Sequence, residues 1–265
     1  MRWPRHTLDN LGAYVPAVTG AKACHLPARE EVSEQLSMER LLGLAVFGEK
    51  VAARTYALMA DLRREDAVLL RKFAQMEGKH ALWFSQACAA NGIKPDRSFA
   101  DRELGYLIEQ VDAHHAAGDF DALVVLQGFI VECLAISTYE PFIEIASKYP
   151  GMQEVFARAL EEEKIHVEWV TRYLRERFAG RDAEFLALVE RVNSQGVECV
   201  GGTLMNITEY LECIGLSGAD CAGAMTDEYT KLLERVGISA RLATRNVVSL
   251  FVPLIRKFRR REQTK

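Results

Sequence analysis

From Ser37 onward, apolar residues recur with the three-to-four-residue spacing of an α-helix, and the strict alternation of a half-buried strand is hard to find. Glycines and a Tyr149-Pro150-Gly151 turn separate the periodic stretches. The pattern predicts helices over residues 38–62, 66–90, 98–117, 119–147, 152–178, 182–214, 218–236 and 239–258. We therefore expect an all-α protein.

The fourth predicted helix, over residues 119–147, is the most apolar. Pro141 lies inside it, and we expect a kink there because proline removes a backbone donor and clashes with the preceding turn. Its most apolar run, from Ala122 to Ser137, is shorter than the roughly 20 residues needed to cross a membrane and contains polar residues. The pattern predicts a buried core helix and no transmembrane segment.

The periodic region is flanked by two different ends. Residues 1–36 hold three of the seven prolines and show no sustained period, so they are predicted to form an irregular arm. Residues 37–258 form one predicted helical domain, and 259–265 a basic tail. The cations from Arg256 to Arg261 have two interpretations: a solvated terminus, or a docking patch for an acidic electron donor, whose association complementary charge accelerates.

Composition narrows the class of protein. A formal charge of −4 argues against a general nucleic-acid binder, which would need a broad basic surface. The six cysteines are scattered and form no C-x-x-C pair, which disfavours a zinc ribbon or a disulfide framework. No apolar export segment follows the N-terminus. We expect a reducing, cytoplasmic compartment.

Two histidines each stand three residues after a glutamate: His80 after Glu77, and His166 after Glu163. On a helix, positions i and i+3 share a face, so each pair can aim a carboxylate and an imidazole at one point. Either pair alone is commonplace on a solvated helix surface. A glutamate upstream of each pair makes a shared metal site the better interpretation.

Each pair is preceded by a glutamate on an apolar helix face: Glu49 before Glu77, and Glu132 before Glu163. Burying an ionised carboxylate is costly unless a cation or hydrogen bonds compensate it. Each interval is about one helix plus a tight turn, so the helices of each half can be antiparallel neighbours. The alternative is ordinary helix packing, with the glutamates paired to lysine or arginine.

The surroundings of the two upstream glutamates also repeat. A small residue lies four positions before, an alanine three positions after and a tyrosine seven positions after each one: Ala45, Ala52 and Tyr56 around Glu49, and Gly128, Ala135 and Tyr139 around Glu132. Small side chains along one stripe leave room for an ion or a ligand beside the carboxylate. The phenol follows further along the same helix.

Two carboxylates and two Glu-x-x-His pairs are the ligand set of ferritin-like di-iron and di-manganese proteins. Four carboxylates balance the charge of two divalent cations, and mixed oxygen and imidazole ligation favours iron or manganese over zinc. The sequence thus predicts a ferritin-like four-helix bundle core with additional C-terminal helices. Its predicted metal ligands are Glu49, Glu77, His80, Glu132, Glu163 and His166.

The segments around these ligands resemble those of aldehyde-deformylating oxygenases: Phe47 to Tyr56, Met76 to His80, Ile130 to Tyr139 and Glu162 to His166. The resemblance implies an O2-activating non-haem di-iron oxygenase that converts an aliphatic aldehyde to a hydrocarbon and formate. It also implies two iron ions, with manganese as an alternative, O2 as co-substrate and an external electron donor of the ferredoxin type or another reductase. The substrate is expected to be a small apolar organic molecule.

Three further residues are predicted to act in catalysis because they match residues that the family keeps near the metals or the substrate channel: Tyr139, Gln127 and Cys88. Tyr56 matches such a residue as well. A buried amide needs partners, so Gln127 is expected to hydrogen-bond a ligand. Cys88 has two interpretations, a catalytic thiol or a small core hydrophobe.

Ferritin-like centres host several reactions, which leaves two alternatives to aldehyde cleavage. One keeps the di-iron centre and oxidises a nitrogen, as in an amine, hydroxylamine or hydrazine, or a carbon centre of a specialised metabolite. The other is an iron-binding protein or ferroxidase. A ferroxidase needs a hydrophilic entry path, whereas the helix around Glu132 is strongly apolar, which favours an organic substrate.

Overall fold

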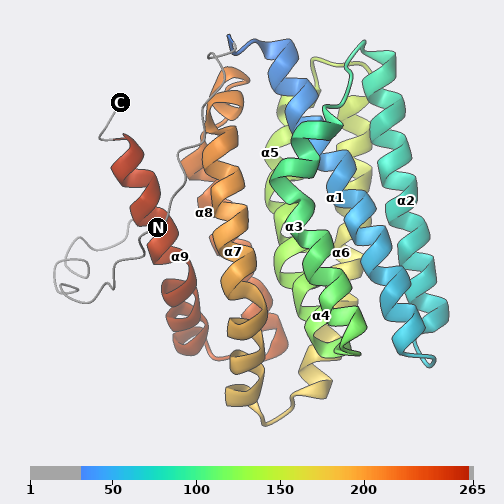
Figure 1. Ribbon diagram of the computed structural model, residues 1–265, viewed down its shortest axis with the longest axis vertical. Helices are drawn as coiled ribbons and strands as arrows, with labels where there is room; N and C mark the ends of the chain where they lie inside the picture. The colour runs from blue at the N-terminus through green and yellow to red at the C-terminus, as the bar shows by residue number, and fades with distance from the viewer. Residues whose placement is uncertain (1–30, 263–265) are drawn as a thin grey trace. The chain divides into compact units, whose positions relative to one another are not determined.

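The computed structural model describes residues 31–262, which are almost entirely helical and include no strand. The all-α fold class predicted from the sequence is confirmed. In chain order the elements, shown in Figure 1, are α1 (Glu34–Leu62), α2 (Ala67–Ala90), α3 (Arg97–Ala116), α4 (Phe120–Leu126), the π-helical segment η2 (Gln127–Glu132), α5 (Cys133–Ala146), α6 (Met152–Arg177), α7 (Asp182–Cys213), α8 (Gly218–Val236) and α9 (Ala240–Glu262).

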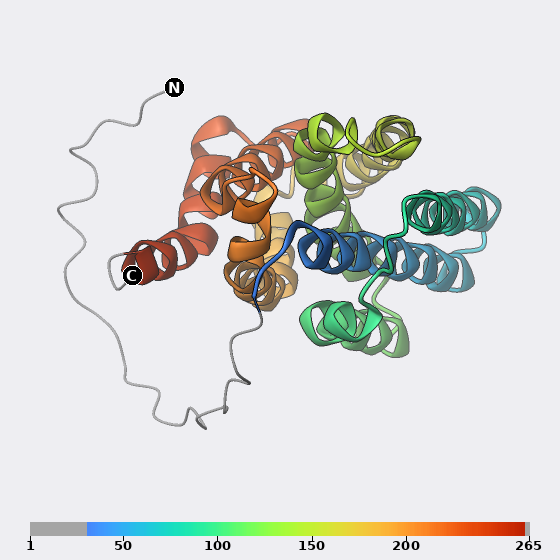
Figure 2. The same ribbon diagram turned by 90° about the horizontal axis from the view of Figure 1, so that it is seen from above.

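Four helices form the core around which the others pack. α1 and α2 are joined by a short turn and lie against each other, as do α5 and α6. Contacts of α2 with α6 and of α1 with η2 join these two hairpins. α7, α8 and α9 gather on one side, and α2 lies at the edge farthest from them in both views (Figures 1 and 2).

Four helices, α1, α3, α4 and α8, begin at a residue whose side chain caps the first turn. Ser33, Asp96, Asp119 and Ser217 each accept a hydrogen bond from the backbone N–H three residues further on, which satisfies a donor that the first helical turn leaves free. Gly151 precedes α6 with φ of 76°, in the left-handed region that glycine adopts without strain. Among the core helices, local sequence thus marks the start of α1, by the Ser33 cap, and of α6, by Gly151.

The fourth predicted helix differs from the expectation in one respect. Its hydrogen-bond pattern changes at Gln127–Glu132, where one turn is π-helical, while α5 runs as an α-helix on both sides of Pro141. Gly128 shows why this turn can lie so close to α6. A Cβ atom on Gly128 would overlap Val170 Cγ1, so any larger residue would require η2 or Val170 to shift.

The same apolar stretch lies in a helical run over Phe120–Ala146, within one residue at each end of the helix predicted over 119–147. By length and composition alone it is able to cross a membrane. However, 72% of its most apolar window is buried inside the protein. Burial of that kind is typical of the core helix of a bundle, as the sequence predicted.

The structure describes little of the predicted N-terminal arm and only the backbone at the end of α9. α1 begins at Glu34, three residues before the expected start of the helical domain at residue 37. Most of the predicted arm, residues 1–30, lies outside the described residues. α9 continues to Glu262, so its backbone is helical into the predicted basic tail. The side chains from residue 253 onward lie outside the described ones.

Candidate metal centre

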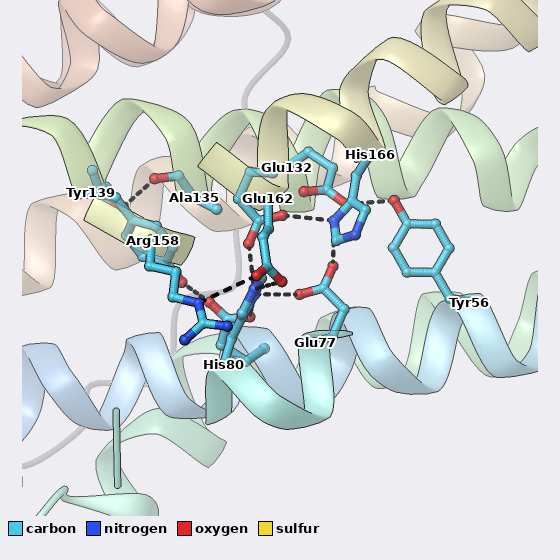
Figure 3. Close-up of polar contacts among 12 residues, drawn as sticks. Tyr56, Glu77, His80, Glu132, Ala135, Tyr139, Arg158, Glu162 and His166 are labelled. Carbon is cyan, nitrogen blue, oxygen red and sulfur yellow. Dashed lines mark hydrogen bonds and ion pairs between the residues drawn. The ribbon is translucent and has the colours of Figure 1, made fainter. Parts of the chain in front are cut away.

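The structure brings the six predicted metal ligands together inside the four-helix core (Figure 3). One carboxylate comes from α1 and one from η2, while α2 and α6 each supply a glutamate and a histidine one turn apart. All six side chains are buried, with no more than 2% of any residue exposed: Glu49, Glu77, His80, Glu132, Glu163 and His166. Each helix of the core thus aims its polar side chains at one point.

The six residues form two overlapping groups of possible ligands. Each group has one ligand atom per residue, and these atoms lie within 4.8 Å of one another: Glu49, Glu77, His80 and Glu163 in one group, and Glu77, Glu132, Glu163 and His166 in the other. Glu77 and Glu163 belong to both groups. The arrangement could therefore hold two adjacent metal ions, with two carboxylates common to both positions.

Both imidazoles turn Nδ1 toward the carboxylates. His80 Nδ1 lies 3.1 Å from Glu49 Oε2 and 3.2 Å from Glu163 Oε1. His166 Nδ1 lies 2.9 Å from Glu163 Oε2 and 3.0 Å from Glu77 Oε1. The two rings therefore face the same shared carboxylates from opposite halves of the bundle.

Crowding of like charges in a buried site governs the electrostatics. Burial and the nearby Glu163 carboxylate raise the pKa of Glu77 and of Glu132 well above their usual values. Burial alone would also raise the pKa of Glu163, but hydrogen bonds from His166 and His80 lower it. Burial alone would lower the pKa of His80, yet its carboxylate partners raise it. Without a metal ion, protons must balance the charge.

The donor set fits two divalent cations. Among the described residues, the ion pairs of these four carboxylates are made with the two histidines and with no lysine or arginine. The carboxylate oxygens of Glu77 form ion pairs only with the two imidazoles among the described residues, and the Nε2 atom of His166 is buried without a hydrogen-bond partner there. Hard oxygen donors with two imidazoles suit iron or manganese.

Two tyrosines hydrogen-bond the carboxylates that belong to one ligand group each, Glu49 and Glu132. Each tyrosine reaches across from the other half of the site. Tyr56 follows Glu49 on α1, but its hydroxyl donates to Glu132 Oε1 at 2.6 Å. Tyr139 follows Glu132 on α5, but its hydroxyl donates to Glu49 Oε1. Figure 3 shows the two phenols on opposite sides of the cluster. Burial and the neighbouring carboxylates raise the pKa of both hydroxyls, which keeps them donors.

Gln127 lies beside Glu132, one of the six predicted metal ligands. Its Nε2 donates to Glu132 Oε1 at 2.9 Å. The two residues are five apart, and a π-helical turn brings positions i and i+5 together. The π-helical segment therefore places both the glutamate and the amide that holds it.

Sequence reasoning missed Glu162. Its Oε2 lies 3.1 Å from His80 Nε2, on the side of the ring away from the cluster, and its Oε1 lies 3.5 Å from Arg158 Nε. The guanidinium carbon of Arg158 in turn lies over the Trp83 ring, 3.9 Å from the ring centroid. A carboxylate on the outer nitrogen of a metal-ligating histidine commonly fixes the orientation of its ring. The sequence does hold three consecutive glutamates, Glu161 to Glu163. Their order along the chain does not indicate that Glu162, rather than Glu161, reaches His80.

The two halves of the site differ at this point. By sequence register, the counterpart of Glu162 is Met76, because each directly precedes the glutamate of its Glu-x-x-His pair. Methionine offers no carboxylate, and His166 Nε2 has no hydrogen-bond partner among the described residues. The two halves of the internal repeat therefore differ at the outer nitrogen of the imidazole: His80 has a carboxylate partner there, and His166 has none among the described residues.

Cys88 lies apart from the metal ligands. It is fully buried among apolar residues that include Phe84, and it does not line the cavity described below. Burial raises the pKa of its thiol to about 12, so the side chain is a neutral thiol near pH 7. This environment is that of a small core hydrophobe, the second of its two interpretations.

An apolar cavity opens onto the cluster. It has an empty volume of about 1060 Å³, part of it open to solvent, and its walls come from α1, α3, η2, α5, α7 and α8 as well as α2 and α6. The carboxylates of Glu49, Glu77, Glu132 and Glu163 lie at its inner end, and the rest of its lining carries no charged side chain. Thr138 and Thr203 are among its few polar residues. The cavity suits an uncharged, apolar ligand.

Comparisons with known proteins agree with this geometry. A family model described as long-chain fatty aldehyde decarbonylase matches residues 33–251. Among solved structures, the chain is similar to a protein from Synechococcus with aldehyde deformylating oxidase activity, with a TM-score of 0.76 and 22% sequence identity. The match covers 83% of this chain and 98% of that one. The resemblance predicted from the sequence is confirmed, and the structural likeness supports the predicted helical fold.

Proposed function

Because the chain belongs to the long-chain fatty aldehyde decarbonylase family, we propose that it is an O2-dependent di-iron oxygenase acting on an aliphatic aldehyde. The products are a hydrocarbon one carbon shorter than the aldehyde, and formate. One observation carries the proposal beyond family membership: an apolar, otherwise uncharged cavity ends at four buried carboxylates. An alkyl chain fits such a cavity, with its polar aldehyde group at the cluster.

Two iron ions, or manganese in their place, would be held by the six buried ligands. Glu77 and Glu163 belong to both ligand groups and would contribute to both metal positions, with Glu49 and His80 at one position and Glu132 and His166 at the other. When bound, the metals supply the redox chemistry that activates O2 and act as a Lewis acid toward the substrate carbonyl.

The protein's own side chains prepare this site. Tyr56 and Tyr139 donate hydrogen bonds to the carboxylates of opposite halves, and Gln127 adds a second donor to Glu132. These bonds fix each carboxylate in one orientation before any ligand arrives. The apolar walls exclude water from the reacting end of the aldehyde.

The stoichiometry of the reaction requires an electron donor. Conversion of an aldehyde and O2 to a hydrocarbon, formic acid and water balances only when four electrons and four protons are added. The cluster's ligands do not supply four electrons, so an external donor is part of the proposal. A ferredoxin-type carrier and a reducing cytoplasmic compartment, both expected from the sequence, are consistent with it.

The lining of the cavity argues against a protonated amine as substrate and against a ferroxidase, while an uncharged nitrogen or carbon substrate remains the alternative to an aldehyde. An amine that is protonated near pH 7 would need a counter-charge, and the cavity offers none apart from the proposed metal ligands. A ferroxidase would need a polar path by which iron enters, whereas the residues that line this cavity are mainly aliphatic and aromatic. A neutral substrate with an alkyl chain avoids both problems.

The test follows product formation with a chemical reductant present. The protein is loaded with iron and mixed with O2, an aldehyde of about 8 to 18 carbons, and an excess of dithionite with a small mediator, because the reduced di-iron centre alone would hold only two of the four electrons. The proposal expects formate and a hydrocarbon one carbon shorter, in equal amounts. Glu132→Gln, which removes a ligand charge but keeps an acceptor for Tyr56, should lose at least about a hundredfold in product. Iron-dependent consumption of O2 without hydrocarbon would contradict the assignment.

A further inference from the structure

A second hollow lies on the surface between α2 and α6. We call it the α2–α6 groove; residues of these two helices alone line it, and none of them also lines the apolar cavity. α2 lies at the edge of the bundle away from α7 and α8, which form part of the cavity wall (Figures 1 and 2). The groove and the cavity therefore approach the cluster by different walls.

The rim of the groove carries an excess of positive charge. Lys72 and Lys79 of α2 and Arg172 of α6 are exposed, and they make no ion pair with any residue that the structure describes. Among the carboxylates of the groove, Glu162 is already engaged by His80 and Arg158, which leaves Glu168 as the unpaired one. On a chain with a net charge of −4, this rim is a local basic surface.

Apolar side chains are exposed on the same two helices. Val68 is 86% exposed, Leu82 54% and Ile165 50%; these are three of the four large hydrophobic residues found exposed in the described part of the chain. On α2, Val68, Lys72, Lys79 and Leu82 follow one helical stripe by their spacing. A mixture of exposed apolar groups and unpaired cations is typical of a surface that binds a protein partner.

The floor of the groove is connected to both imidazoles by short chains of contacts. Glu162 lines the groove and lies 3.1 Å from His80 Nε2 (Figure 3). Trp169 also lines it, with its ring centroid 6.0 Å from that of Phe73, which is 4.6 Å from the His166 ring. An electron that enters at the groove has only one or two side chains to cross before it reaches a histidine of the cluster.

From this arrangement we propose that the α2–α6 groove is the docking surface of a small, acidic one-electron carrier of the ferredoxin type. The inference rests on the proposed function, which consumes four electrons for each aldehyde. Each docking event oxidises one carrier by one electron and reduces the enzyme by one electron, so four events complete a turnover. The aldehyde occupies the cavity on the other wall, and the two partners do not compete for space.

The test measures electron transfer without aldehyde chemistry. A reduced plant-type [2Fe–2S] ferredoxin is mixed anaerobically with the oxidised, iron-loaded full-length protein, and its reoxidation is followed by absorbance. The groove variant combines Lys72→Glu, Lys79→Glu and Arg172→Glu. We expect its second-order rate constant to fall about tenfold or more at low salt, with the difference shrinking as salt rises.

A matched control changes net charge equally at exposed cations outside the groove: Lys94→Glu, Lys148→Glu and Arg245→Glu. Iron content and thermal unfolding should match the wild type in both variants. Equal rates for the groove variant and the wild type, an equal loss in the control, or no reoxidation by the wild type would each overturn the proposal. So would a loss seen only on deletion of residues 256–265, which would place docking at the basic tail.

The docking surface and the proposed function can be tested separately. Turnover of an aldehyde driven by dithionite and a small mediator needs no protein carrier. Under those conditions the groove variant should form hydrocarbon at the wild-type rate. An absence of hydrocarbon from the wild type contradicts the proposed function, whereas an unchanged ferredoxin rate in the groove variant contradicts the docking surface alone.

Discussion

Glu162 is the residue that most clearly separates the two halves of the metal centre. It holds the outer nitrogen of His80, while the corresponding nitrogen of His166 has no hydrogen-bond partner among the described residues. Because residues that orient a metal-ligating histidine tune its binding, the two proposed metal positions should differ in affinity. The position nearer His80 should depend on Glu162.

We predict that Glu162→Gln lowers the affinity of one of two bound metal ions by about tenfold to a hundredfold and leaves the other unchanged. Titration with Fe²⁺ or Mn²⁺ under anaerobic conditions, followed by calorimetry, measures both sites. Glu161→Gln is the matched control, because that side chain is exposed and its one ion pair among the described residues is with Lys164. Equal affinities for the Glu162 variant and the wild type would show that this contact does not position His80.

At the residue scale, the sequence predicted what the internal repeat encodes. The two Glu-x-x-His pairs and their upstream glutamates converge as expected, because helical spacing and one tight turn per hairpin are local properties. It did not reveal that each tyrosine crosses to the carboxylate of the other half, nor that Glu162 reaches His80. Those contacts depend on how the hairpins are packed, which spacing along the chain does not specify.

Among the elements, η2 departs most from the regular pattern. Apolar spacing identified the helix but not the π-helical turn, since a single extra residue in one turn hardly alters the periodicity of a helix that is apolar on every side. The sequence signals were Gly128 and the five-residue interval from Gln127 to Glu132. Their meaning depends on α6, whose Val170 occupies the space that a side chain at position 128 would need.

We predict that Gly128→Ala destabilises the protein by about 1–3 kcal/mol, because the new methyl group would overlap Val170 and force η2 away from α6. It should also weaken metal binding, since Glu132 ends this segment. Chemical denaturation and metal titration measure the two effects. Adding Val170→Ala should recover part of the metal affinity by making room for the methyl group.

The matched control is Gly223→Ala. Gly223 is exposed within α8, and a Cβ atom there would have no neighbour within 4 Å. Alanine is the better helix former, so this variant should be more stable than the wild type by roughly 0.5–1 kcal/mol. Equal behaviour of the two glycine variants would show that the close approach at Gly128 does not limit the position of η2.

At the scale of the whole molecule, the metal centre joins two hairpins that are distant in sequence. α1 and α2 supply half of the ligands, and η2 and α6 supply the other half. Without metal, four buried carboxylates share a site with two imidazoles, and burial and mutual repulsion raise the pKa of Glu77 and Glu132. The apo-protein therefore carries a local electrostatic cost that divalent cations relieve.

We predict that metal stabilises the entire fold, because its ligands come from both hairpins and are not assembled in the unfolded chain. At a free metal concentration about 100 times Kd, the gain is about 2.7 kcal/mol per site, which corresponds to a rise in Tm of roughly 5–10 °C for one site. Scanning calorimetry with Fe²⁺ or Mn²⁺, before and after chelation, measures it, and metal analysis should give about two ions per chain.

Glu132→Gln decides whether the effect arises at this centre. Burial raises the pKa of Glu132 and favours its neutral form in the apo-protein, which glutamine resembles, while the amide oxygen still accepts from Tyr56 and Gln127. The apo-protein of this variant should therefore be at least as stable as the wild type. Its gain on metal addition should fall by half or more, because one of the two positions loses a charged ligand. A variant that gains as much as the wild type would mean that the stabilising metal binds elsewhere on the chain.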